Sequence, residues 1–134
     1  MKANVRWLEG MCFEGLSESG HRIVLDGTNP GQGPSPMEAV LLGAGGCSAI
    51  DVVSILEKGR QQVTGCEVEL DADRAENPPR VFTRIRLHFV VTGQALPEKQ
   101  VARAVELSMK KYCSVMKMLE KAVEVSSSFE IRAA

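Results

Sequence analysis

Residues 35–56, SPMEAVLLGAGGCSAIDVVSIL, contain the longest apolar run of the chain and decide its fold. Ser35, Pro36 and Glu38 form a capping box with proline at the first helical position, so a helix is predicted to begin here. The run is apolar nearly all round, interrupted by Asp51 and two serines, which is typical of a helix that is buried in a domain or spans a membrane. The acid and three glycines favour a central helix wrapped by sheet.

Short strands are predicted on both sides of this helix. Before the helix, apolar and polar residues alternate and glycines separate the alternating segments, which indicates an antiparallel meander. The first of these segments alternates as a half-buried strand does. A loop is predicted over residues 26–36. The predicted strands lie near 2–7, 12–16, 21–25, 63–70, 81–91 and 123–131. A second helix opens at Pro97 and Glu98 and bends or restarts near Tyr112. The order βββ-α-ββ-α(α)-β predicts an α+β fold with mainly antiparallel pairing.

Length and composition restrict the class of protein further. The 134 residues suffice for one domain, residues 1–134, with a net charge of -1 and only 4% aromatic residues. Nucleic acid and anionic membranes are therefore not expected as partners, since both favour a basic excess and bases favour aromatic platforms. No apolar signal segment precedes the domain, and four cysteines are few for a disulfide scaffold, so a cytoplasmic protein with reduced thiols is expected.

The four cysteines differ in context. Cys12 and Cys66 lie in strand patterns without a second ligand at metal spacing, and we interpret them as core residues. Cys47 follows a pair of glycines inside the helix, where either a packed neighbour or a small ligand could approach the backbone closely. Cys113 lies where a helical segment begins, and the helix dipole there is expected to lower its pKa.

Asp51 lies one helical turn after Cys47 on the same face. A buried acid has to be hydrogen-bonded or paired, and structural acid networks outnumber catalytic ones, so a bond to a neighbouring element is the favoured interpretation. A role in positioning water or substrate is the alternative. The two histidines, His21 and His88, carry no motif that points to catalysis.

Two stretches of the chain resemble the OsmC/Ohr family, the osmotically inducible and organic hydroperoxide resistance proteins. Residues 34–49 are similar to the helix that carries the family's first cysteine, and residues 112–115 to its second cysteine site. Residues 46–53 look most like the YhfA-like branch, and the resemblance extends over essentially the whole chain. It implies an intertwined homodimer in which sheets from both chains wrap two central helices.

The resemblance also implies an activity. Cys47 would be the peroxidatic cysteine and Cys113 the resolving cysteine of a thiol-dependent reductase, with a small organic hydroperoxide as substrate, a dithiol as reductant and neither cofactor nor metal. Glu38 and Arg22 are the candidate assisting residues. The family's peroxidases have a glutamate where this chain has Met37, one position before Glu38. The alternative is a non-peroxidase dimer of the same fold that binds a small molecule or serves in stress without catalytic activity.

Overall fold

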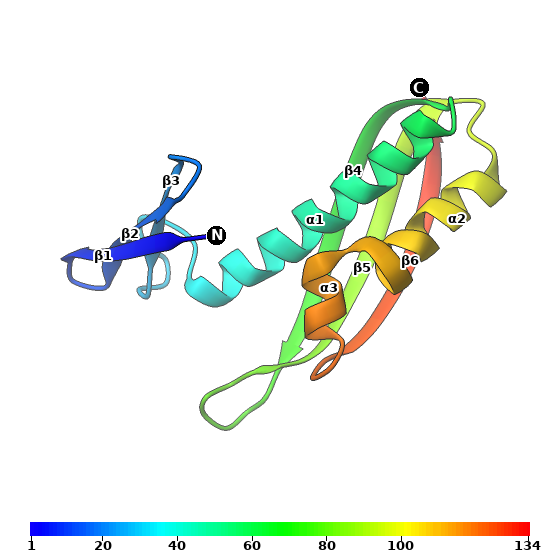
Figure 1. Cartoon of the computed structure of the whole chain (residues 1–134). Coiled ribbons are helices and arrows are strands. Elements are labelled where there is room, and N and C mark those ends of the chain that lie inside the picture. The colour runs from blue at the N-terminus through cyan, green and yellow to red at the C-terminus, as the bar shows by residue number, and fades with distance from the viewer. The chain divides into compact units, whose positions relative to one another are not determined.

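The computed structural model describes residues 1–134, which divide into two compact units, Met1–Leu42 and Gly43–Ala134. The elements along the chain are labelled in Figure 1. Their order matches the predicted βββ-α-ββ-α(α)-β order, with a π-helical turn between the last two helices. They are β1 (Ala3–Glu9), β2 (Cys12–Ser17), β3 (Arg22–Asp26), α1 (Pro36–Lys58), β4 (Gln62–Arg74), β5 (Phe82–Gln94), α2 (Glu98–Leu107), η1 (Ser108–Tyr112), α3 (Ser114–Leu119) and β6 (Glu124–Ala133).

The N-terminal unit holds the predicted antiparallel meander, with strand order β1-β2-β3. The expectation that β1 is half-buried is wrong for this chain, because every residue of the strand is exposed. Val5 is 61% and Trp7 64% exposed. Alternation identifies the face of a strand that is suited to burial, but no element within the N-terminal unit covers that face of β1.

An ion cluster joins the three strands of the meander. Glu14 on β2 accepts hydrogen bonds from Arg22 on β3 and, at 2.9 Å, from Nη2 of Arg6 on β1. The Arg22 guanidinium, helped by Arg6, holds the pKa of the Glu14 carboxyl below its usual range although burial opposes that shift.

Acid is therefore expected to weaken the fold through Glu14. A carboxyl whose pKa is lowered by folding stabilises the native state above its unfolded pKa, about 4.3 for glutamate, and loses that contribution as the pH falls through the folded value. Glu14→Gln should reduce the fall in the free energy of unfolding between pH 5 and pH 3, measured by urea titration. Glu9→Gln, at an exposed position, is the control. An unchanged pH profile for Glu14→Gln would contradict the argument.

The C-terminal unit is built on a sheet with strand order β4-β5-β6. β4 and β5 pair antiparallel, whereas β5 and β6 pair parallel, with Phe89 opposite Phe129. Parallel neighbours need a crossover, and the helices between β5 and β6 provide it. The sheet thus differs from a fully antiparallel one at its last strand (Figure 1).

Helix α1 begins at the predicted capping box. The backbone N–H of Ser35 donates to Oε1 of Glu38 at 2.9 Å, and the N–H of Glu38 donates to Oγ of Ser35 at 3.2 Å. By length and composition alone α1 could cross a membrane, a test that core helices also pass. One face of it is buried in this chain, while Leu42 is 64% and Ile50 70% exposed.

The core of the C-terminal unit lies between its sheet and its helices. β5, the central strand, contributes the largest number of buried apolar side chains, and α1, α2 and α3 each add at least one. Gly45 allows α1 to approach β4, because a Cβ there would lie 2.7 Å from Cδ1 of Leu70. The largest fully buried apolar side chains are Phe89, Leu56, Ile85, Leu87, Met116, Val52, Val91 and Val101.

Candidate active site

The two cysteines singled out from the sequence lie together in the C-terminal unit. The Sγ atoms of Cys47 and Cys113 and a carboxylate oxygen of Asp51 all lie within 4.8 Å of one another. Cys47 and Asp51 are half-buried, whereas Cys113 is fully buried. Both thiols are free. The site therefore pairs one thiol that solvent can reach with one that it cannot.

Local backbone structure brings these groups together. On α1, Cys47 and Asp51 are four residues apart and lie on one face. Opposite them, α2 gives way to the π-turn η1, in which the N–H of Cys113 donates to the carbonyl of Ser108 at 2.8 Å. Cys113 is then extended, with φ −70° and ψ 105°, before α3 begins. π-turns are frequent at functional sites, and this one sets the position of the second thiol.

Buried hydrogen bonds fix the environment of Cys113. Its Sγ lies 3.4 Å from Oγ of Ser48 and accepts from the N–H of Met116 at 3.5 Å. The Ser48 hydroxyl has one hydrogen, which it donates to the carbonyl of Ala44 at 2.7 Å. Ser48 therefore joins the Cys113 sulfur to the backbone of α1.

The predicted direction of the Cys113 pKa is wrong. Cys113 does form the N-cap of α3, as its place in the sequence indicated. Burial nevertheless raises the pKa of its thiol, and the neighbouring Cys47 adds to that rise, while Ser48 and Met116 oppose it. Desolvation outweighs the dipole of a helix that is only six residues long.

Asp51 is held by a neighbouring element, as the structural interpretation expected. Oγ of Ser108 donates to Oδ2 of Asp51 at 3.0 Å and lies 3.3 Å from the carbonyl of Ser48. Sequence reasoning assigned no role to Ser48 or Ser108, which are both fully buried. The sequence does indicate that each is a polar residue on the buried face of a helix. A buried hydroxyl needs a hydrogen-bond partner, and this requirement could have pointed to both serines.

The other two candidate site residues lie in the N-terminal unit and have partners there. The carboxylate of Glu38 accepts from Ser35 in the capping box, and Arg22 is paired with Glu14.

The capping box provides a stability test. Ser35→Ala is expected to lower the free energy of unfolding by about 1 kcal/mol, because it removes an N-cap acceptor. Glu38→Gln should leave stability near that of the wild type, since glutamine also serves in a capping box. Urea unfolding measures both variants. Equal stability of Ser35→Ala and the wild type would show that the cap contributes nothing.

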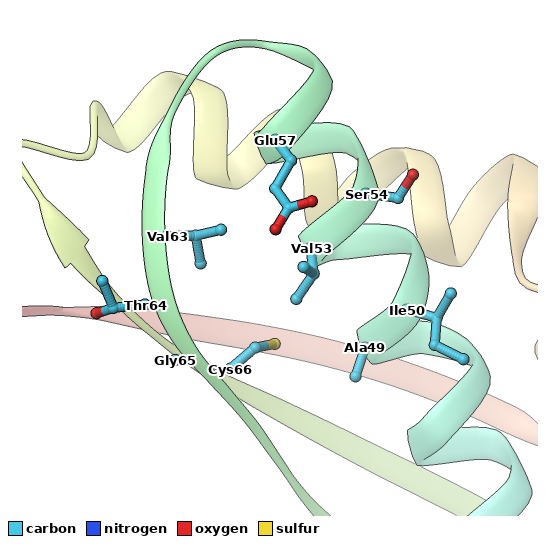
Figure 2. Close-up of a pocket in the computed structure, with 9 residues that line it drawn as sticks. All are labelled: Ala49, Ile50, Val53, Ser54, Glu57, Val63, Thr64, Gly65 and Cys66. Carbon is cyan, nitrogen blue, oxygen red and sulfur yellow. The ribbon is translucent and has the colours of Figure 1, made fainter.

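The remaining cysteines lie apart from this pair. Cys12 is buried in β2, as predicted, whereas Cys66 on β4 is half-buried, and burial raises the pKa of its thiol. Cys66 lines a cleft of about 550 Å³ between β4 and α1. Figure 2 shows Val63 and Cys66 directed from β4 toward α1, whose Glu57 adds a carboxylate at the rim. The lining residues are Ala49, Ile50, Val53, Ser54, Glu57, Val63, Thr64, Gly65 and Cys66.

Known proteins resemble this chain over its whole length. The family model described as OsmC-like protein matches residues 28–128, a range that includes both site cysteines. Protein YhfA of Escherichia coli strain K12 is 60% identical over 134 residues, which is the whole of both chains.

Solved structures show the same fold. A hypothetical protein from Aquifex aeolicus VF5 is 29% identical with a TM-score of 0.90, covering 99% of this chain and 96% of that one. The organic hydroperoxide resistance protein OhrB of Bacillus subtilis is 16% identical with a TM-score of 0.64, covering 96% of each chain. The chain belongs to the OsmC family of α+β proteins.

Proposed function

We propose that this protein is a thiol-dependent redox protein that reduces small organic hydroperoxides with Cys47 and Cys113. The observation that carries the proposal is the approach of the two Sγ atoms to within 4.8 Å, with one thiol half-exposed and the other buried. Membership of the OsmC family supports it. The relative from Bacillus subtilis is by name an organic hydroperoxide resistance protein.

The chemistry is a two-electron reduction of the peroxide bond. The Cys47 thiolate attacks the terminal oxygen of ROOH, the O–O bond breaks, and Cys47 becomes a sulfenic acid. The alkoxide that leaves takes a proton from water and becomes the alcohol ROH. The Cys113 thiol then attacks that sulfur, which releases water and forms a disulfide. An external dithiol returns both cysteines to thiols and is itself oxidised to a disulfide.

The difference in burial suits this division of roles. A peroxide can reach Cys47, which is half-exposed, but not Cys113, which is fully buried. For the disulfide, the Sγ separation must shorten to about 2.05 Å. Cys113 lies between the π-turn and α3, in extended backbone, and a small movement there would close the gap.

Glu38 and Arg22 are the residues proposed to assist the reaction. Glu38→Gln separates a catalytic contribution from the capping one, because it preserves the cap while removing the charge. If Glu38→Gln reduces peroxide more slowly than the wild type but unfolds with the same free energy, the Glu38 carboxylate contributes to catalysis. We also propose a cytoplasmic location, because a reducing compartment keeps Cys47 and Cys113 in the thiol form.

We also infer that the working form is a homodimer. Apolar side chains on α1 and β1 are exposed in the single chain, among them Leu42, Ile50 and Trp7. Exposed apolar surface of this kind favours association. Light scattering is expected to give twice the 14.5 kDa mass of one chain, and a monomer at micromolar concentration would contradict the inference.

The proposed reaction is tested by intact mass. Reduced protein treated with one equivalent of cumene hydroperoxide should lose two hydrogens, and peptide mapping should find a Cys47–Cys113 disulfide. A stable sulfenic or sulfinic acid on Cys47 without the disulfide would remove the resolving role of Cys113. No reaction at all would overturn the proposal.

A binding protein without catalysis is the second candidate, and the cleft between β4 and α1 favours it (Figure 2). Its volume of about 550 Å³ suits a small organic molecule. The probe is 1-anilinonaphthalene-8-sulfonate, whose fluorescence should rise on binding. Val53→Arg should abolish the rise, while Cys47→Ser should keep it. Equal fluorescence with Val53→Arg and wild type would exclude the cleft.

A further inference from the structure

We propose that Cys47, Asp51 and Cys113 form a binding site for a thiophilic divalent cation such as Zn²⁺ in the reduced protein. The inference goes beyond the proposed peroxide chemistry, because it concerns binding and needs no peroxide. It rests on three ligand atoms of suitable type within 4.8 Å of one another. Two thiolates and one carboxylate are a ligand set that zinc accepts.

The spacing of the three atoms is close to what a tetrahedral ion requires. Zn–S bonds of about 2.3 Å place two sulfur ligands about 3.8 Å apart around a tetrahedral centre. The observed separations, none greater than 4.8 Å, need only a small contraction to reach that geometry. Cys47 and Asp51 lie one turn apart on one helix, so both reach the ion from the same side.

Surrounding hydrogen bonds are placed to support such an ion. Ser108 donates to Oδ2 of Asp51, which orients the carboxylate and leaves Oδ1 for the metal. The N–H of Met116 points at Sγ of Cys113 and would stabilise the thiolate that forms when the thiol gives up its proton. Partners of this kind orient metal ligands and raise affinity.

The site would hold the ion in an open, exchangeable form. Three protein ligands leave a fourth tetrahedral position, and the half-exposed Cys47 and Asp51 give water access to it. A bound ion would also occupy both thiolates. The metal-loaded protein is therefore expected to resist alkylation and oxidation at Cys47 until a chelator removes the ion.

Cobalt(II) is the probe for this site, because thiolate ligation gives an intense charge-transfer band in the near ultraviolet. In an anaerobic titration of reduced wild-type protein, the intensity of that band should stop rising at one equivalent of cobalt per chain. Added zinc should displace the cobalt and remove the band. Cys113→Ser should remove at least half of the band intensity. Asp51→Asn, which keeps an oxygen for Ser108 to bond, should weaken cobalt binding tenfold or more.

Cys66→Ser is the matched control, because it removes the other half-exposed thiol and should leave the titration unchanged. Circular dichroism of each variant shows that it is folded. Cobalt binding that survives Asp51→Asn and Cys113→Ser unchanged, or that is lost in Cys66→Ser, overturns the proposal. So does wild-type protein that gives no thiolate band. Neither result bears on disulfide formation with hydroperoxide, which is measured separately without metal.

Discussion

Cys47→Ser is expected to lower the rate of hydroperoxide reduction about a thousandfold or more, to the level of the uncatalysed thiol reaction. Losses of this size follow removal of a catalytic nucleophile. A serine hydroxyl cannot form a sulfenic acid, and the buried Cys113 is out of reach of the peroxide. The measurement is consumption of cumene hydroperoxide with a dithiol in excess.

Two matched variants make that result specific. Cys66→Ser also removes a half-exposed thiol and should keep wild-type turnover, which excludes a general effect of thiol loss. Without dithiol, Cys113→Ser should still perform the first reaction step, so one equivalent of alcohol forms, but it cannot form the internal disulfide. Full multiple-turnover activity in Cys47→Ser would contradict the assignment of the nucleophile.

The start of α1 and the grouping of the two thiols could be foreseen to different degrees. The capping box of Ser35 and Glu38 is local chemistry, so the sequence predicted the helix start and the structure confirms it. The nearness of Cys47 and Cys113 was implied by family resemblance alone, since no local pattern relates residues so far apart. The structure confirms this nearness.

Features that depend on tertiary surroundings could not be foreseen. The alternation of apolar and polar residues is the same in parallel and antiparallel strands. The sequence pattern therefore could not predict that β6 pairs parallel to β5. The pKa of Cys113 was predicted from a helix dipole, whereas its burial beneath neighbouring elements decides the direction. Burial likewise turns Ser48 and Ser108 from ordinary helix residues into the hydrogen-bonding frame of the site.

Phe89→Ala is expected to lower the free energy of unfolding by about 3–5 kcal/mol. Phe89 is fully buried on β5, the central strand of its sheet, and truncation leaves a cavity that the packed neighbours fill only in part. A loss of this size is a large share of the roughly 5–15 kcal/mol that stabilises a typical domain. Urea unfolding followed by circular dichroism measures it.

Phe129→Ala is the matched comparison, because Phe129 lies directly opposite Phe89 on β6 but is only half-buried. Both substitutions remove the same side-chain atoms from the same sheet. The difference between the two decreases in the free energy of unfolding therefore reflects the difference in burial and not the residue type. Phe89→Ala should therefore cost the more of the two, and a Phe129→Ala loss of equal size would show that β6 packs as tightly as β5. The C-terminal unit also carries Cys47 and Cys113, so Phe89→Ala should make both thiols alkylate faster at urea concentrations where the wild type still protects Cys113.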